Sequence, residues 1–250
     1  MRRQLQPETV ALLKHRSYEK EILDQPDYDP GLANEGYRFM AFVNRLFGGV
    51  RNVRRFVEEQ AKARPAGEPL RVLDIGSGIC DIPIAVTRWA RRRGIDVRFT
   101  CLEISPHAPG MATGRIGRAG LSDYIRIVEE DAFTHQPSAP YDCAVGSMFF
   151  HHLAEDEILR LIGRLRTFVR RSVLVNDLGR NWPDYLGAWL LTLPLSRETR
   201  HDALLSVKRS FKPKDLASLL GRLPNVSVAA RNTWLFRVEA IVRFREDRGS

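Results

Sequence analysis

A short run of residues near position 75 has the composition of a ligand-binding turn. It reads Asp74-Ile-Gly76-Ser-Gly78-Ile-Cys80, after an apolar stretch suited to a buried parallel strand and before a helical pattern. A strand that passes through glycines into a helix leaves unpaired backbone N–H groups beside a space without side chains. The spacing therefore predicts a ligand that approaches the main chain closely, and the alternative is an ordinary tight turn.

The residues of this turn exclude two common phosphate-binding motifs. A dinucleotide-binding turn needs a third glycine where this chain has Asp81, and a phosphate-binding loop needs a following Gly-Lys-Ser/Thr, which the sequence lacks. The carboxylate of Asp74 would repel a pyrophosphate. It suits a ligand that carries an ammonium group and no phosphate.

A second acidic residue, Glu103, ends the next apolar stretch of the chain. A carboxylate at the carboxyl end of a second strand is placed to accept hydrogen bonds from two ribose hydroxyls. The alternative is a cap for the helix that begins at Pro106, because Glu103 and Ser105 both suit a helix N-terminus. We favour ribose binding, since Glu103 falls in the right topological position.

Two adjacent histidines, His151 and His152, follow the fourth apolar stretch. Ligands of open α/β sheets bind beyond the carboxyl ends of the strands, so this segment should face the ligand. A histidine can act as general base toward a phenol because its pKa lies near neutrality. An equally good interpretation is that the pair orders the loop and caps the helix that starts near Asp156. The sequence does not choose between the two histidines.

Taken together, these segments resemble the class I S-adenosylmethionine-dependent methyltransferases. Asp74-x-Gly76-x-Gly78 is similar to motif I of that family, with Cys80 where the family often has glycine. The aromatic and histidine-containing segment after the fourth strand resembles the ubiquinone- and menaquinone-biosynthesis type. The resemblance implies S-adenosyl-L-methionine as the cofactor and S-adenosyl-L-homocysteine as its product.

The same resemblance implies which residues hold the cofactor. Gly76 and Gly78 would lie against its methionine part, and Asp74 would support the loop or the amino group. Asp131, in the acidic turn after the third strand, would accept a hydrogen bond from the exocyclic amine of adenine; an acidic surface turn is the alternative. The implied set is Asp74, Gly76, Gly78, Cys80, Glu103, Ile104, Asp131, Ala132 and Ser147.

The chain lacks the metal-ligand pattern of catechol methylation. That chemistry needs carboxylate and amide ligands after the fourth and fifth strands, and here only Asn176 and Asp177 follow the fifth. We therefore expect no metal and a metal-independent enzyme, in which these two residues orient the substrate. Further candidates for substrate contact are Tyr37, Phe149, Trp182, Tyr185 and His201.

Strand and helix patterns alternate through most of the chain, which predicts βαβ units and a parallel sheet. We expect an α/β fold with a Rossmann-like seven-stranded methyltransferase sheet, helices on both faces and a final antiparallel strand. The expected strands are 72–75, 97–102, 125–128, 142–145, 172–175, 226–231 and 235–244. Residues 1–66, helical from Glu8, would form an N-terminal cap. Residues 67–250 would form the main domain, with a helical lid inserted at about 180–223.

Composition limits the classes of partner. The net charge is +9, but the charge comes from 33 arginines and six lysines scattered along helices, so a nucleic-acid partner is disfavoured. No apolar run reaches the ~20 residues of a membrane span, and no secretory signal is evident. Three isolated cysteines suggest buried thiols in a reducing cytoplasm. The oligomeric state stays open, with a dimer as one option.

The sequence thus predicts methyl transfer from the cofactor to an oxygen or carbon of a small, largely apolar acceptor such as a phenol or quinol. The alternatives are an RNA or protein methyltransferase, a non-catalytic module that keeps the fold, and an enzyme that uses the cofactor for another reaction. The Asn/Asp-Pro-Pro-Tyr/Phe signature of amino-group methylation is absent. That absence counts against the first alternative.

Overall fold

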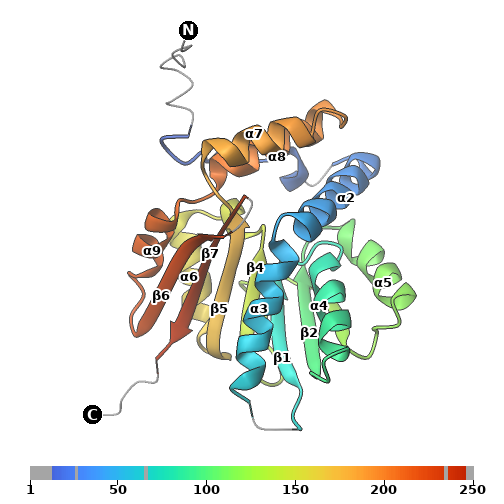
Figure 1. The fold of residues 1–250 in the computed structure, drawn as a ribbon, viewed down its shortest axis with the longest axis vertical. Helices are drawn as coiled ribbons and strands as arrows, with labels where there is room; N and C mark the ends of the chain where they lie inside the picture. The colour runs from blue at the N-terminus through green and yellow to red at the C-terminus, as the bar shows by residue number, and fades with distance from the viewer. Residues whose placement is uncertain (1–12, 26–27, 65–66, 234–235, 246–250) are drawn as a thin grey trace.

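A computed structural model describes residues 13–25, 28–64, 67–233 and 236–245. Seven strands form one sheet in the order β3-β2-β1-β4-β5-β7-β6 (Figure 1). The strands are β1 (Leu70–Ile75), β2 (Val97–Glu103), β3 (Ile125–Glu129), β4 (Tyr141–Ser147), β5 (Val169–Leu178), β6 (Val226–Thr233) and β7 (Arg237–Phe244). β1 to β5 pair in parallel, and β7 runs antiparallel to both β5 and β6. The predicted fold class is confirmed.

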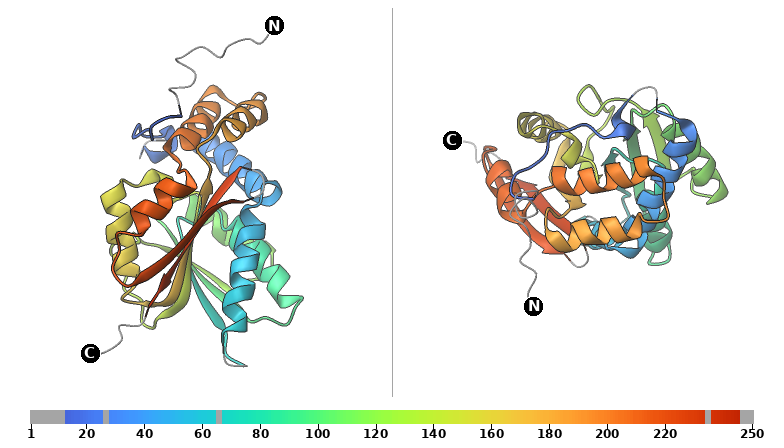
Figure 2. Two further views of the ribbon diagram at one scale, coloured as in Figure 1. Left: turned by 60° about the vertical axis from the view of Figure 1, so that its left-hand side comes forward. Right: turned by 90° about the horizontal axis from the view of Figure 1, so that it is seen from above.

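The helices cover both faces of the sheet and its carboxyl edge (Figures 1 and 2). They are α2 (Pro30–Leu46), α3 (Gly49–Lys62), α4 (Asp81–Arg91), α5 (Ala108–Arg118), α6 (Glu155–Leu165), α7 (Trp182–Leu191), α8 (Arg197–Arg209) and α9 (Pro213–Leu220), with short 3₁₀ turns η1 (Ile22–Asp24) and η2 (Phe150–His152). Helices α3, α4 and α5 share an apolar core with one face, and α6 and α9 share a second core with the other.

Four elements lie over the carboxyl ends of the strands: η1, α2, α7 and α8 (Figure 2). Asp29 caps α2 by accepting hydrogen bonds from the backbone N–H groups of Gly31 and Leu32, at 2.8 and 3.0 Å. Ser196 caps α8 by accepting from the N–H of Thr199 at 3.1 Å. Both helices therefore begin at side chains suited to a helix N-terminus.

The segment expected to be an N-terminal cap and the segment expected to be a lid each have one part over the strand ends and another part that packs on the sheet. Before residue 66, α2 lies over the strand ends whereas α3 packs on the sheet beside α4. Within 180–223, α7 and α8 lie over the strand ends, whereas α9 contacts β6 and β7. The helix expected from Glu8 begins outside the described residues, and residues 13–21 are not helical.

Two smaller expectations also have outcomes in the structure. Cys80, Cys101 and Cys143 are buried free thiols, as expected. Among the described residues, none of the helices combines the length and the apolar character that crossing a bilayer would require.

Candidate active site

The glycine turn joins β1 to α4 in a strained backbone conformation. Gly76, Gly78 and Cys80 have φ angles of 63°, 51° and 56°, in the left-handed region that glycine adopts without penalty. A Cβ atom at Gly76 would lie 2.4 Å from Cδ2 of Phe149, so only glycine fits beneath that ring. The turn thus brings its main chain against the segment that follows β4.

Three carboxylates surround this turn: Asp74, Asp81 and Glu103. Burial, with Asp81 and Glu103 nearby, raises the pKa of Asp74 well above its usual range. Burial also raises the pKa of Asp81, although Asn44 donates a hydrogen bond to it at 3.1 Å. Because carboxylates that crowd together gain most from a neighbouring cation, this end of the site suits a positively charged ligand.

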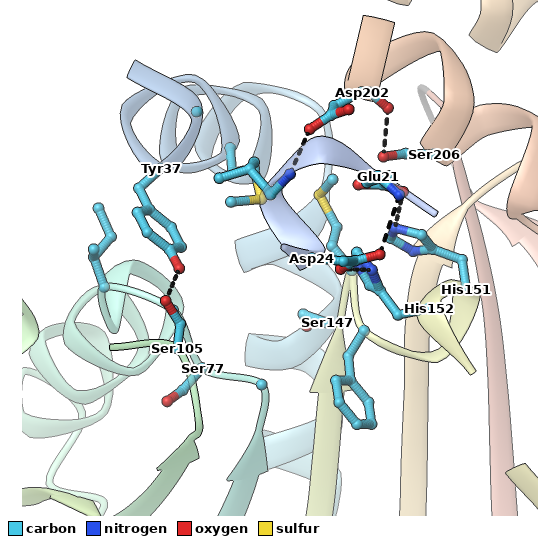
Figure 3. Close-up of a pocket in the computed structure, with 18 of the residues that line it drawn as sticks. Glu21, Asp24, Tyr37, Ser77, Ser105, Ser147, His151, His152, Asp202 and Ser206 are labelled. Atoms are coloured by element: carbon cyan, nitrogen blue, oxygen red, sulfur yellow. Dashed lines mark hydrogen bonds and ion pairs between the residues drawn. The ribbon is translucent and has the colours of Figure 1, made fainter. Parts of the chain in front are cut away.

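Glu103 links the turn to the end of β2. Its Oε2 accepts a hydrogen bond from the N–H of Gly78 at 2.7 Å, and its Oε1 accepts from the N–H of Ser105 at 2.9 Å. The hydroxyl of Tyr37 donates to Oγ of Ser105 at 2.8 Å (Figure 3). Each carboxylate oxygen keeps a lone pair for a further donor, which is what two adjacent hydroxyls of a ligand would need.

Beyond Glu103, the site has an apolar surface with an acidic edge. Ile104 is 66% exposed and lines the site together with buried Ala132. Asp131 also lines it, and its Oδ1 accepts a hydrogen bond from the N–H of Phe133 at 2.9 Å. An exposed isoleucine can pack against one face of a flat ring. The neighbouring carboxylate can accept a hydrogen bond from an amino group on that ring.

Asn176 fixes Ser147 in the middle of the site. Its Nδ2 donates to Oγ of Ser147 at 2.9 Å, and its Oδ1 accepts from Nδ2 of Asn52 at 3.0 Å. Asn176 lies within β5, directly opposite Ser147 at the end of β4. The amide is therefore a buried support for Ser147.

His151 forms a buried pair with Asp177. Its Nδ1 lies 2.7 Å from Oδ1 of Asp177, whose other oxygen accepts a hydrogen bond from the N–H of His151 at 3.1 Å. On the opposite side, Nε2 of His151 lies 3.5 Å from Oε1 of buried Glu21. Burial alone would lower the pKa of His151, but Asp177 and Glu21 outweigh it and raise the pKa to about 9. Burial would likewise raise the pKa of Asp177, but His151 lowers it to about 2.

His152 lies beside His151, with ring centroids 4.1 Å apart, and is only partly buried. Its Nδ1 lies 2.8 Å from Oδ1 of Asp24. Burial would raise the pKa of Asp24, but His152 and Arg209 lower it below its usual range. Figure 3 shows both histidines facing Glu21 and Asp24 of the N-terminal segment, across the cavity from Tyr37 and Ser105.

Two buried or half-buried arginines hold this N-terminal segment against the histidine loop. Arg209 donates to the carbonyl oxygens of His151 at 3.1 Å and His152 at 2.8 Å, and also to Asp24 at 3.0 Å. Arg16 donates to the carbonyl oxygens of His151 at 2.8 Å and Leu153 at 2.7 Å. Guanidinium groups that bind several oxygens at once fix the loop in one arrangement.

The glycine turn and the histidine pair line one cavity of about 510 Å³. Its roof comes from α2, η1, α7 and α8. Asp202 of α8 accepts hydrogen bonds from the N–H groups of Ile22 and Leu23, both at 2.9 Å, which ties α8 to η1. A volume of this size, mostly apolar with a few convergent polar groups, is typical of a small-molecule site.

Neither a comparison with protein-family models nor one with curated proteins gives a match to this chain. Comparison with solved structures does. The plantazolicin methyltransferase BpumL bound to S-adenosylhomocysteine has a TM-score of 0.66 at 13% identity, over 96% of this chain and 98% of that one. The S-adenosylmethionine-dependent methyltransferase SibL has a TM-score of 0.61 at 21% identity, over 94% of this chain and 65% of that one. Magnesium protoporphyrin IX methyltransferase from Synechocystis PCC 6803 has a TM-score of 0.53 at 16% identity, over 79% and 83%.

The fold is that of the class I S-adenosylmethionine-dependent methyltransferases. At these identities the likeness concerns the fold, and the sites of this chain are argued from its own residues. Most residues expected from the sequence do line this cavity: Tyr37, Asp74, Gly76, Gly78, Glu103, Ile104, Asp131, Ala132, Ser147, Phe149, His151 and His152. The methyltransferase fold therefore brings both ends of the expected site together.

Six expected residues are not among the described residues that line the cavity. Cys80 is buried in the core behind the turn. Asn176 and Asp177 are part of β5 and do not follow it, so they support Ser147 and His151 from behind. Trp182 and Tyr185 pack with Leu13, Leu178 and Val207, of which Leu178 and Val207 line the cavity in their place. His201 is exposed and lies beside Glu19 and Asp202 on the outside of α8.

The lid contributes four acidic residues that were not expected at the site: Glu21, Asp24, Asp184 and Asp202, all of which line the cavity. Burial raises the pKa of Asp184 to about 7, despite a hydrogen bond with Asn181. Glu21 lies in the segment expected to be helical from Glu8, and no local pattern marks it or Asp24 as a partner of the histidines. Their only sequence signal is that two carboxylates precede an apolar helix.

Glu21, His151 and His152 also offer one ligand atom each within 4.8 Å of one another, which is close enough for a metal ion. In this structure each histidine already faces a carboxylate, Asp177 for His151 and Asp24 for His152. Oε1 of Glu21, Nε2 of His151 and Nδ1 of His152 nevertheless have no hydrogen bond of good geometry among the described residues. The expectation of a metal-independent enzyme remains a prediction.

Proposed function

We propose that this chain is a methyltransferase that uses S-adenosyl-L-methionine to methylate an oxygen or carbon of a small, largely apolar acceptor such as a phenol or quinol. One observation carries the proposal: a single cavity runs from a glycine turn surrounded by carboxylates to a buried His151–Asp177 pair. A cationic cofactor and a proton-bearing acceptor would therefore meet between the two ends.

The cofactor fits the carboxylate-rich end. Its ammonium and sulfonium groups are the positive charges that Asp74, Asp81 and Glu103 favour, and Glu103 has lone pairs for two ribose hydroxyls. Ile104 and Ala132 would pack against adenine, with Asp131 at its amino group. When bound, the cofactor supplies an already activated methyl group, so the protein contributes mainly positioning and exclusion of water.

The acceptor would lie at the histidine end. Asp177 holds Nδ1 of His151, so Nε2 is the nitrogen that faces the cavity beside Glu21. An acceptor hydroxyl that takes the place of Glu21 next to Nε2 removes one of the charges that raise the pKa of His151. The pKa then falls toward neutrality, where an imidazole is an effective general base.

The walls between the two ends indicate an apolar acceptor. Leu23, Met40, Val43, Phe47, Met148, Phe149, Leu153, Leu178, Ala188, Leu191 and Phe236 line the cavity. Polar side chains besides the carboxylates of the lid, among them Asn44 and Thr199, also line the cavity, but most of its wall is apolar. An aromatic ring with one or two hydroxyls would satisfy both the apolar walls and the histidine.

The test is methyl transfer from radiolabelled cofactor to a panel of phenols, quinols, fatty acids and RNA. We expect label in a phenol or quinol, and we expect His151→Ala to reduce transfer about 10²-fold or more while cofactor affinity stays unchanged. His201→Ala, outside the cavity, serves as the matched control. Transfer to RNA alone, or equal activity of wild type and His151→Ala, would contradict the proposal.

Metal independence has its own measurement. We expect the initial rate to be the same before and after dialysis against a chelator, because Nδ1 of His151 and Nδ1 of His152 already lie 2.7 and 2.8 Å from the carboxylates of Asp177 and Asp24. A rate that is lost with the chelator and restored by one divalent cation would show that Glu21, His151 and His152 act as ligands.

A further inference from the structure

The outside of the lid carries an exposed apolar face. Leu186, Trp189 and Leu190 of α7, and Leu193 just after this helix, are between 42% and 54% exposed. Their spacing is that of one helical face. On neighbouring α2, Phe42 and Leu46 are also about half exposed. We call these six residues the lid face. The right-hand view of Figure 2 looks down on this side of the molecule, where α7 and α8 lie side by side.

The lid face contains no acidic group and has basic residues at its edge. No residue from 185 to 196 is charged. Exposed Arg38 and Arg45 share the helical face of Phe42 and Leu46 on α2. Exposed Arg197 begins α8, and Arg200 donates to the carbonyl oxygen of Leu193 at 2.7 Å. An apolar surface with tryptophan and an arginine rim is complementary to the interface of an anionic membrane.

The lid face also adjoins an opening toward the active site. A cleft between α2 and α7 is lined by Arg38, Phe39, Phe42, Leu191 and Leu195, among others. Phe39 and Leu191 line the inner cavity as well. These two side chains are therefore shared by the outer cleft and the active-site cavity. Movement of either side chain would join the outer cleft to the place of the acceptor.

We propose that the lid face binds the surface of a membrane that contains anionic lipids, and that the acceptor enters from that surface through the cleft between α2 and α7. The choice of a membrane rests on the charge: the six residues of the lid face include no acidic group, four arginines edge the face, and the chain carries +9 overall. The adjoining cleft contains one carboxylate, Glu35, which accepts hydrogen bonds from Ser196 and Thr199. Helix α7, ten residues long, would lie in the interface and not cross it. The entry route rests on the proposed function, whereas the membrane binding does not.

The test is co-sedimentation of the full chain with phosphatidylcholine vesicles, with and without phosphatidylglycerol. We expect binding to the anionic vesicles that weakens as salt is added, and little binding to neutral ones. Leu190→Glu should abolish it. Arg38→Ala/Arg45→Ala, a pair of exposed substitutions that leaves the fold intact, should weaken it about tenfold or more. Arg92→Ala/Arg118→Ala removes the same charge from helix ends distant from the lid and should have little effect.

Three outcomes would overturn the proposal: no binding to anionic vesicles, equal loss with both arginine pairs, or a wild-type dimer that Leu190→Glu converts to a monomer. The last would show that a second copy covers the lid face. Methyl transfer to a short, water-soluble phenol is measured in parallel without vesicles. Its persistence in Leu190→Glu separates failure of membrane binding from failure of the proposed activity.

Discussion

The two ends of the cavity are built in different ways. At the cofactor end, Asp74, Gly76, Gly78 and Glu103 come from two neighbouring parallel strands and the turns that follow them. At the acceptor end, His151 depends on Asp177 of β5, Glu21 of the N-terminal segment and Arg209 of α8. The first end is encoded locally, whereas the second exists only when segments far apart in sequence are packed together. Substitutions at the two ends should therefore have different effects on stability, methyl transfer and cofactor affinity.

The largest effect is expected at the acceptor end, from Asp177→Asn. Breaking a fully buried ion pair costs about 3 kcal/mol of stability, and loss of the group that orients His151 should lower methyl transfer about 10²- to 10³-fold. Urea unfolding and initial rates measure the two effects. Asp156→Asn, an exposed carboxylate at the start of α6, is the control.

The pH dependence of that stability difference has a definite sign. The pKa of His151 is raised to about 9, so its contribution is complete below about pH 6.5 and is lost as the pH rises through about 9. The pKa of Asp177 is lowered to about 2, so its contribution is present above about pH 4 and is lost as the pH falls through about 2. The difference between wild type and Asp177→Asn should be largest between these limits. A difference that does not change with pH would mean that the two groups are not an ion pair.

At the cofactor end, Glu103→Gln should weaken binding of S-adenosyl-L-methionine about ten- to hundredfold, because charged hydrogen bonds to two hydroxyls become neutral ones. The free energy of unfolding should also fall by about 1 kcal/mol, because a glutamine can accept from only one of the N–H groups of Gly78 and Ser105. Isothermal calorimetry measures the affinity. Glu129→Gln is the matched control, since Glu129 ends β3 directly opposite Glu103 and is exposed outside the cavity. Equal affinities for the two variants would show that Glu103 does not bind the ribose.

Arg209→Lys should distinguish the two ends of the cavity, because it removes hydrogen bonds that hold the acceptor end and leaves the cofactor end unchanged. A lysine cannot bind the carbonyl oxygens of His151 and His152 together with Asp24, so we expect kcat to fall about tenfold at unchanged cofactor affinity. Exposed Arg222→Lys is the control. Loss of cofactor binding in Arg209→Lys would mean that the two ends are not separate.

The smallest expected effect is the change in cofactor affinity when the pH is lowered. The pKa of Asp74 is raised by burial and by its carboxylate neighbours, and a cationic cofactor favours its ionised form. Affinity for S-adenosyl-L-methionine should therefore fall about fivefold as the pH is lowered and Asp74 takes up a proton, with proton release on binding. Calorimetry in buffers of different ionisation heat detects those protons. Asp74→Asn should flatten the dependence, and a wild-type affinity that rises in acid would contradict this assignment.

The contrast between the two ends also explains what could be predicted from the sequence. Apolar stretches and the glycine spacing of residues 70–81 predict the parallel strands and the turn, because these features depend on neighbours in the chain. Glu103 and Asp131 follow successive apolar stretches, so their places at successive strand ends are predicted in the same way. The pattern also predicts His151 and Asp177 at adjacent strand ends, but it does not predict that they form a pair.

The residues of the lid could not be assigned in this way. Residues 13–21 are held in a non-helical conformation by contacts with α8 and the histidine loop, among them the bonds of Arg16 to His151 and Leu153. Trp182 and Tyr185 belong to an apolar helix, but which side of α7 faces the cavity is decided by packing against Leu13 and Val207. Such choices depend on tertiary contacts, which local patterns do not contain.

The most direct test of the central claim is a calorimetric titration of S-adenosyl-L-methionine into wild type, Glu103→Gln and His151→Ala. If one cavity holds the cofactor at the glycine turn and the acceptor at the histidine pair, wild type and His151→Ala will bind with the same affinity and Glu103→Gln about ten- to hundredfold more weakly. Absence of binding to the wild-type protein would contradict the account, and so would a loss of affinity in His151→Ala as large as that in Glu103→Gln.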